Sequence, residues 1–185
     1  NHGPLCAAYN QNYTSEGDTP SFMPCVDNGL LHHTDYTLGG WGGRPVYEGA
    51  SNHMIDGHDD CYTSDTSLCN NGPSSGHYAF QRWLFAAQND WASRADWCVA
   101  ANYADANHQP NAQVAGGLER SVAAGSTVTL DASPSTDPDG NNLTFLWWQY
   151  HEADSVTAEV TIENNTSQTA SFVVPSEPGK QVHII

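Results

Sequence analysis

The chain has 185 residues, 38% of them hydrophobic, and a formal net charge of −16 with only five Lys and Arg residues. This apolar content is enough for a folded core and excludes global disorder. A surface this acidic repels phosphate backbones and anionic headgroups, which argues against nucleic acids and charged membranes as partners. No run of roughly eighteen apolar residues occurs, so the sequence predicts no membrane span.

Both ends of the chain suggest a piece of a longer protein. It begins Asn1-His2-Gly3-Pro4, without an initiator Met or a signal peptide. It ends within a strand-like pattern at residues 182–185. We therefore expect a missing N-terminal portion or a companion chain, and a C-terminal domain that is truncated.

The five cysteines predict disulfides of the kind found in secreted proteins. Cys61 and Cys69 flank a short polar loop and are expected to bond. Cys6 and Cys25 form a second plausible pair, which leaves Cys98 as a buried thiol on a helix face. Glycosylation sequons begin at Asn12, Asn142, Asn164 and Asn165. Together with the disulfides, the sequons favour a secreted, extracellular protein.

The N-terminal half begins with a helix start and a glycine-rich loop. Pro20 follows Asp18 and Thr19, which predicts a helix beginning near Pro20 with one of the two preceding residues as its cap. Four glycines surround Trp41 and Arg44 in residues 38–47, which predicts a loop whose backbone approaches another group closely. Residues 48–76 are polar and predict a long loop.

The longest helical pattern lies between His77 and Pro110. Apolar residues recur there at a spacing of three and four, at Phe80, Trp83, Leu84, Ala87, Trp91, Ala95, Cys98 and Val99. This spacing predicts a helix with one apolar face, broken once near Asp96. Residues 105–110 end the pattern.

The region after Pro110 alternates with a period of two, as β-strands do. The alternating pairs or runs are 128–130, 143–147, 160–162, 172–174 and 182–184, separated by turns at 137–142 and 175–180. Short strands at this spacing predict a β-sandwich. Trp147 and Trp148 fall on opposite faces of one strand, so one is expected in the core and the other exposed or covered by a neighbouring domain.

Two sets of motifs resemble known families. Residues 125–131, 135–140 and 143–147 resemble an immunoglobulin-like sandwich of the polycystic-kidney-disease-repeat type. Residues 16–22, 40–44, 88–98 and 106–110 resemble a secreted family of cellulose-binding proteins, in which a nucleoside hydrolase-like α/β domain precedes a β-sandwich. The resemblance implies the C-terminal portion of a nucleoside hydrolase-like α/β domain at residues 1–109 and an all-β immunoglobulin-like sandwich at residues 110–185.

This resemblance implies a secreted, carbohydrate-associated protein whose partner is a polysaccharide or a small sugar. One alternative is a calcium-dependent hydrolase of N-glycosidic or glycosidic bonds. Nucleoside hydrolases hold calcium with an aspartate-rich N-terminal motif that this chain lacks, so the hydrolase would be active only with the missing segment. A structural assembly component is the other alternative.

The resemblance suggests a calcium ligand in the N-terminal half, and the residues themselves suggest further binding candidates there. Asp18 is the candidate calcium ligand, because calcium prefers hard oxygen ligands, and the alternative is that it only caps a helix. Trp41 and Arg44 are a candidate sugar-stacking ring and polar anchor, and the alternative is a buried structural Trp. Glu16 is a further candidate for ligand binding.

Three more polar groups have a functional and a structural interpretation. Asn89 and Asp90 are candidate ligand-binding residues on the helix, although a helical ion pair between Asp90 and Arg94 is favoured. A group of histidines and aspartates could bind a metal, but a solvated acidic loop is the favoured interpretation. The group consists of His53, Asp56, His58, Asp59 and Asp60. The turn at residues 137–140 is a candidate calcium site, or a turn that needs no metal.

Overall fold

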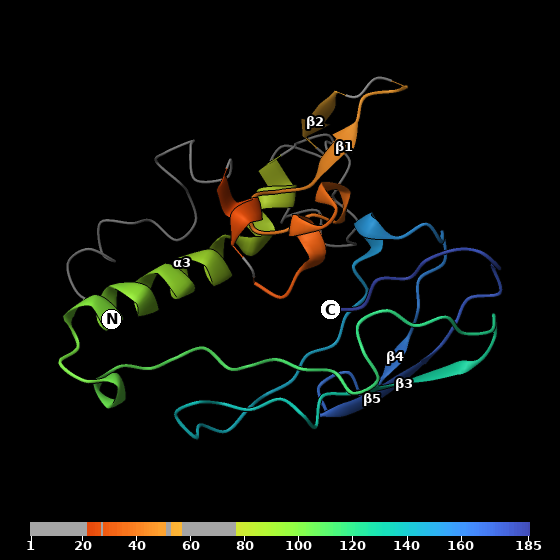
Figure 1. The fold of residues 1–185 in the computed structure, drawn as a ribbon. Helices are drawn as coiled ribbons and strands as arrows, with labels where there is room; N and C mark the ends of the chain where they lie inside the picture. Colours follow the sequence, from red (N-terminus) through yellow and green to blue (C-terminus); the bar gives the residue numbers. More distant parts are fainter. Residues whose placement is uncertain (1–21, 27, 51–52, 57–76) are drawn as a thin grey trace. The chain divides into compact units, whose positions relative to one another are not determined.

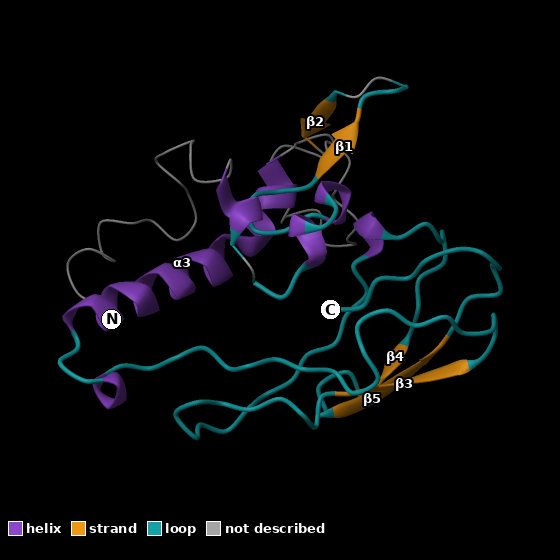
Figure 2. Ribbon diagram, in the orientation of Figure 1, coloured by secondary structure: helices purple, strands orange, loops and turns teal. Residues whose placement is uncertain are grey.

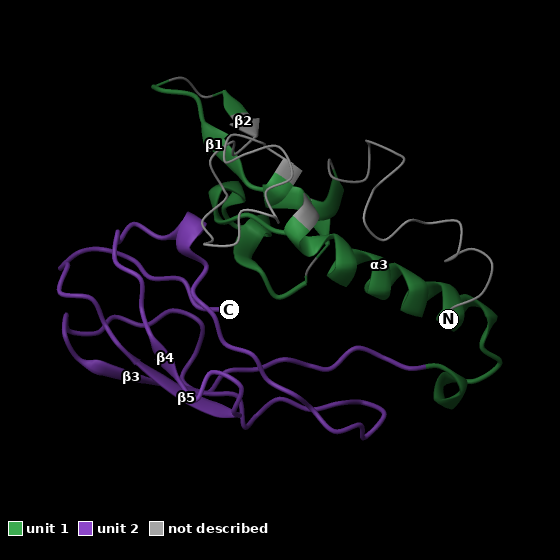
Figure 3. Ribbon diagram, turned by 180° about the vertical axis from the view of Figure 1, so that it is seen from behind, with its two compact units in different colours: residues 1–106 green, residues 107–185 purple. Residues whose placement is uncertain are grey.

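The computed structural model describes residues 22–26, 28–50, 53–56 and 77–185, which are drawn in colour in Figure 1. The chain divides into two compact units, residues 1–106 and residues 107–185 (Figure 3). The sequence analysis placed the boundary between residues 109 and 110.

Short helices and a hairpin lead into one long helix in the first unit (Figure 2). The elements are η1 (Met23–Cys25), η2 (Leu31–His33), η3 (Tyr36–Leu38), β1 (Pro45–Tyr47), β2 (Met54–Asp56), α3 (His77–Val99) and η5 (Tyr103–Asp105). β1 and β2 pair antiparallel. No parallel strand pair occurs within the described part of this unit.

The hairpin corrects the prediction of a continuous loop over residues 48–76. The backbone N–H of Glu48 donates to the carbonyl of His53 at 2.9 Å and closes the turn between the strands. Val46 pairs with Ile55, so two short apolar runs separated by a glycine-containing turn form strands here. The polar composition of the whole stretch concealed this local pattern.

Helix α3 confirms the predicted helix but is not broken at Asp96, whose carbonyl accepts a hydrogen bond from the N–H of Ala100 at 3.0 Å. Leu84 and Ala87 are buried, as the apolar spacing predicts. Toward the C-terminal end Cys98 is exposed and Val99 is 83% exposed, so the expected burial of these two residues is wrong. Helix propensity and backbone hydrogen bonds extend α3 beyond the residues whose side chains are buried.

None of the helices in the described residues is both long enough and apolar enough to cross a membrane.

A three-stranded antiparallel sheet forms the centre of the second unit. Its strands are β3 (Thr127–Asp131), β4 (Ile162–Glu163) and β5 (Thr169–Val173), in the order β3-β5-β4, and η6 (His151–Ala153) precedes β4. In this register Leu130 lies opposite Ala170, and Phe172 lies opposite both Val128 and Ile162. The predicted strands at 128–130, 160–162 and 172–174 therefore correspond in part to β3, β4 and β5.

The other two predicted strands, at residues 143–147 and 182–184, are extended chain rather than full strands. Trp148 and Ile185 exchange two backbone hydrogen bonds of 2.8 and 2.9 Å, and Gln149 bridges Ile184. Upstream, the N–H of Trp147 donates to the carbonyl of Asn165, which lies in a turn. Pairing with a turn residue interrupts the ladder that a strand over 143–147 would need.

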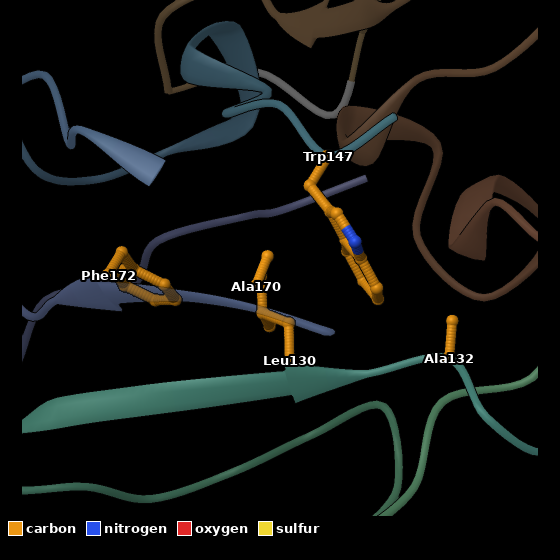
Figure 4. Close-up of a cluster of buried hydrophobic side chains, with 5 residues drawn as sticks. All are labelled: Leu130, Ala132, Trp147, Ala170 and Phe172. Atoms are coloured by element: carbon orange, nitrogen blue, oxygen red, sulfur yellow. The ribbon is translucent and has the colours of Figure 1, made fainter. Parts of the chain in front are cut away.

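The hydrophobic core of the second unit lies on one face of the sheet. Its buried members are Leu130, Ala132, Trp147, Ala170 and Phe172 (Figure 4). The indole N–H of Trp147 donates to the carbonyl of Ser167 at 2.8 Å, so this large ring is buried without leaving its polar group unpaired. Trp147 is thus the core member of the predicted pair. Trp148 is half-buried, with its ring 5.8 Å from that of Tyr150.

Candidate functional site

A hollow of about 460 Å³ in the first unit is the candidate functional site. It is lined by His33, Thr34, Asp35, Tyr36, Tyr47 and Met54. The first four residues come from the end of η2 and the start of η3, and the last two come from the hairpin of β1 and β2. Two short segments that are separate in sequence therefore form its walls.

The η2–η3 wall is shaped by local side-chain hydrogen bonds. One carboxylate oxygen of Asp35 accepts hydrogen bonds from the N–H of Thr37 at 2.9 Å and from its hydroxyl at 2.7 Å. Asp35 is thereby the N-cap of η3. The hydroxyl of Thr34 donates to the carbonyl of Leu31 at 2.7 Å and closes η2. These bonds fix the turn that presents Tyr36 to the hollow.

Two tyrosine rings are the main aromatic surface of the hollow. Tyr36 is 50% exposed and Tyr47 is 61% exposed. Tyr47 lies directly opposite Met54 across the hairpin, and directly opposite residues in a strand pair project to the same face. The register of the hairpin therefore brings the side chains of Tyr47 and Met54 to the hollow together.

A buried histidine lies behind Tyr36. His32 is only 4% exposed, and neither of its ring nitrogens has a hydrogen-bond partner among the described residues. Its ring meets that of Tyr36 edge to face, with centroids 5.5 Å apart. Burial lowers the pKa of the His32 imidazole, and the neighbouring His33 lowers it further. The imidazole is therefore predominantly neutral at pH 7 and lies behind Tyr36 as an uncharged ring.

The glycine-rich loop that contains Trp41 and Arg44 lies beside this wall. Gly40 and Gly43 exchange two backbone hydrogen bonds of 3.0 and 2.9 Å, which turn the chain back on itself. A guanidinium nitrogen of Arg44 donates to the carbonyl of Thr37 at 3.3 Å. Trp41 is half-buried. Neither Trp41 nor Arg44 is among the described residues that line the hollow, although Arg44 is bonded to the central residue of η3.

The candidate residues on α3 form an ion pair rather than part of the hollow. The Nε of Arg94 donates to a carboxylate oxygen of Asp90 at 2.7 Å, four residues apart on the helix. This is the pair that the spacing favours, and exposed pairs of this kind contribute little to stability. Asn89 is exposed on the same helix.

The acidic turn at residues 137–140 uses its carboxylates internally. Asp137 accepts backbone hydrogen bonds from Asp139 at 2.9 Å and Asn141 at 3.0 Å. Asp139 accepts a 2.6 Å bond from the N–H of His108 and lies 3.1 Å from its ring nitrogen Nδ1. The hydrogen bonds from His108 hold the pKa of Asp139 below its usual value. These contacts account for the aspartates of this turn without a metal.

Several predicted residues lie outside the described part of the chain: Cys6, Asn12, Glu16, Asp18, His58, Asp59, Asp60, Cys61 and Cys69. Calcium binding at Asp18 and the bond between Cys61 and Cys69 therefore stay predictions. Cys25 is exposed with a free thiol, while its expected partner is among the residues not described. Within the described residues, no three or more His, Cys, Asp or Glu side chains gather as a metal site would require.

Sequence patterns missed the residues that make the hollow, although two local signals were present. The segment Asp35-Tyr36-Thr37 has a capping residue two positions before a hydroxyl residue, which favours a turn that exposes Tyr36. The hairpin signal around residues 46–55 would have placed Tyr47 and Met54 opposite each other. Trp41 was the stronger candidate by residue type alone, since it is a tryptophan between glycines.

A second hollow, of about 700 Å³, lies in the second unit beside β4 and β5. Residues 158–161, 163 and 171–177 form most of its lining. Its one aromatic residue, Phe172, is buried in the core of that unit. It offers no exposed ring to a ligand, and for this reason the first hollow is the stronger candidate.

Comparisons with known proteins match the chain at both ends. Residues 1–45 match the model of the nucleoside hydrolase-like domain of cellulose-binding Sde182. Residues 127–185 match the model of the C-terminal domain of cellulose-binding protein Sde0182. Both ends of the chain thus match the cellulose-binding Sde182 family. The η2–η3 wall of the hollow lies within the first matched segment, and the hairpin residues Tyr47 and Met54 follow it.

A solved structure is similar to this chain over nearly its whole length. It is a nucleoside hydrolase-related hypothetical protein from Saccharophagus degradans that is associated with carbohydrate metabolism. The two sequences are 38% identical and the TM-score is 0.70, over 99% of this chain and 46% of that one. This chain thus spans about half the length of that relative. No curated protein matches this chain.

Proposed function

We propose that this chain is a carbohydrate-binding protein and that it holds a neutral polysaccharide of the cellulose type in the hollow of its first unit. The observation that carries the proposal is the pair of exposed tyrosine rings, Tyr36 and Tyr47, lining one hollow together with polar side chains. The match to two cellulose-binding domain models supports the ligand class.

Physical chemistry favours a neutral polymer for this surface. A sugar ring places its apolar C–H face on an aromatic ring, and tyrosine loses little conformational entropy in forming that contact. Hydroxyl groups at the edge of the sugar need hydrogen-bond partners, which Thr34, His33 and Asp35 supply in the same hollow. With a net charge of −16, the chain would repel anionic polymers, whereas a neutral glycan is unaffected.

Two finer features belong to the same proposal. We propose that the second unit is an immunoglobulin-like sandwich, because residues from the sheet and from segments 145–147 and 182–184 contribute to one core. We also propose that the chain is secreted. Three of its sequons, at Asn142, Asn164 and Asn165, are exposed, so their side chains are accessible to a glycosylating enzyme. A mass shift after treatment of the native protein with a deglycosylating amidase would test this.

Retention on cellulose tests the main proposal. The intact protein should be retained on regenerated amorphous cellulose, and retention should change little between low and high salt, because stacking on tyrosine involves no exposed ion pair. Replacing Tyr36 or Tyr47 by Ala should reduce retention strongly. The matched control is Tyr103→Ala, because Tyr103 is a 63% exposed tyrosine that does not line the hollow. Retention that disappears in high salt, or that both hollow variants leave intact, would refute it.

A further inference from the structure

We infer that the hollow selects a short stretch of a single, solvated glycan chain and discriminates against the flat face of crystalline cellulose. This inference rests on the proposed function and adds to it the physical form of the ligand. It follows from three features of the hollow: its concave shape, its polar wall and its rigid support.

Concavity is the first feature. The lining comes from two separate elements, with Tyr36 on the η2–η3 wall and Tyr47 with Met54 on the hairpin wall, around a space of about 460 Å³. That volume is within the range of about 300–1,000 Å³ typical of small-ligand pockets. A flat crystal face makes good contact only with rings that stand in one protruding plane. A single chain, in contrast, can enter a hollow and contact both walls.

The polar wall is the second feature. Consecutive residues His33, Thr34 and Asp35 offer an imidazole, a hydroxyl and a carboxylate at the hollow. Asp35 caps η3 through one carboxylate oxygen, and a carboxylate can accept several hydrogen bonds at once. Sugar hydroxyl groups at a crystal face are already engaged with neighbouring chains. The hydroxyl groups of a solvated chain exchange water for these partners at little cost.

Rigid support is the third feature. Behind Tyr36 lies the buried His32 ring, in edge-to-face contact at 5.5 Å. The Arg44 guanidinium holds η3 through the carbonyl of its central residue, Thr37. A wall that is fixed before binding loses little conformational entropy when the ligand arrives, which favours affinity for a small soluble ligand.

The test compares two ligand forms with the intact protein. Soluble cellohexaose is titrated by calorimetry, and retention on microcrystalline cellulose is measured with and without an excess of cellohexaose. We expect cellohexaose to bind, and retention on the crystalline form to be weak. Tyr36→Ala and Tyr47→Ala should each weaken cellohexaose binding by about tenfold or more, whereas Tyr103→Ala should leave it unchanged. Tyr47→Ala and Tyr103→Ala should keep the unfolding midpoint of the wild type, because both side chains are exposed. Tyr36→Ala also removes the ring contact with buried His32, so its midpoint should fall, and the decisive comparison of affinities is between Tyr47→Ala and Tyr103→Ala.

A second pair of variants tests the polar wall. Asp35→Asn retains an oxygen that caps η3, because Asn is as good an N-cap as Asp, but it removes the charge. Asp35→Ala removes both. We expect the unfolding midpoint to fall only in Asp35→Ala, and cellohexaose affinity to fall in both variants. Unchanged affinity in Asp35→Asn would show that the carboxylate does not contact the sugar and would overturn the polar-wall part of the inference.

The outcomes separate this inference from the proposed function. Strong retention on microcrystalline cellulose that neither cellohexaose nor the tyrosine variants diminish would overturn the inference, while polysaccharide binding itself would stand. If the protein binds neither amorphous cellulose nor cellohexaose, both the proposed function and the inference fall.

Discussion

The ring of His32 meets the ring of Tyr36 edge to face, with the two centroids 5.5 Å apart and the planes at 78°. His32 is buried and Tyr36 is half-exposed, so the contact joins the interior of the first unit to the wall of its hollow. Any change that moves His32 should therefore be felt at the proposed sugar site.

Acidification should weaken the first unit through His32. Burial lowers the pKa of this imidazole below the usual 6.5, so below that pH the unfolded chain takes up a proton that the folded chain does not. The unfolded state then binds more protons, and the free energy of unfolding falls as the pH drops from 6.5 to the folded-state pKa. Above pH 6.5 the effect vanishes. Urea unfolding followed by fluorescence at pH 7.5, 6.5 and 5.5 measures it.

The neighbouring His33, on the same element, adds to the lowering of the His32 pKa that burial causes. His32→Leu should reduce the loss of stability between pH 7.5 and 5.5, because leucine cannot be protonated and the described residues offer no partner for the ring nitrogens. His33→Gln removes only the smaller of the two causes of the lowered His32 pKa, so it should reduce the loss of stability less than His32→Leu does. If wild type and His32→Leu lose stability equally on acidification, His32 is not the group responsible.

Gly40 should tolerate no side chain, because it packs directly on His32. A Cβ added at this position would lie 2.6 Å from the Nδ1 atom of His32, well inside van der Waals contact. Gly40→Ala should therefore destabilise the protein by about 1–3 kcal/mol, the usual cost of overpacking a filled interior. Thermal or urea unfolding gives the value.

The double variant Gly40→Ala with His32→Ala provides the control for this prediction. Removing the imidazole makes room for the new methyl group, so the two substitutions together should cost less than the sum of their separate effects. Strictly additive costs would show that the His32 imidazole is not what limits the methyl group at position 40, because the Cβ of residue 32, 3.1 Å from that methyl, remains in the double variant.

The sequence analysis predicted the elements whose signal is local and repeated. The apolar spacing of three and four marked α3, and the alternation around Leu130 and Phe172 marked β3 and β5. The spacing of the apolar residues alone could not show how much of the apolar face of α3 is packed against other residues. Val99 continues the apolar stripe yet is exposed, because a stripe reveals which side chains share a face and not what packs against that face.

The candidate site was harder to predict, because it depends on two segments meeting in space. Trp41 and Arg44 stood out as residue types, but Arg44 is occupied with the carbonyl of Thr37. Tyr36 and Tyr47 are eleven positions apart, and only the antiparallel hairpin and the Asp35 cap bring both to one hollow. Sequence patterns describe each segment but do not report their distance from each other.

The core of the second unit should depend on Trp147 far more than on its neighbour. Trp147 is buried against Leu130 and Ala170 and pairs its indole N–H with Ser167, so Trp147→Ala leaves a large cavity and an unpaired carbonyl. We expect a loss of about 3–5 kcal/mol. Leu146→Ala, at an adjacent residue that is 64% exposed, should cost less than about 0.5 kcal/mol. Similar losses in the two variants, measured by urea unfolding, would contradict the placement of Trp147 in the core.

The pair formed by Asp90 and Arg94 should prove structural and weak. The two side chains meet at 2.7 Å on the surface of α3, and the Arg94 side chain is 51% exposed, so solvent screens the attraction. Asp90→Asn should change the free energy of unfolding by less than about 0.5 kcal/mol, and Asn89→Ala should have a similarly small effect. Neither variant should alter the affinity for cellohexaose, since neither residue lines the hollow. Calorimetric titration with cellohexaose provides the decisive measurement. A several-fold loss of affinity in Asp90→Asn, with stability unchanged, would show that Asp90 contacts the sugar and that the binding site extends beyond the hollow.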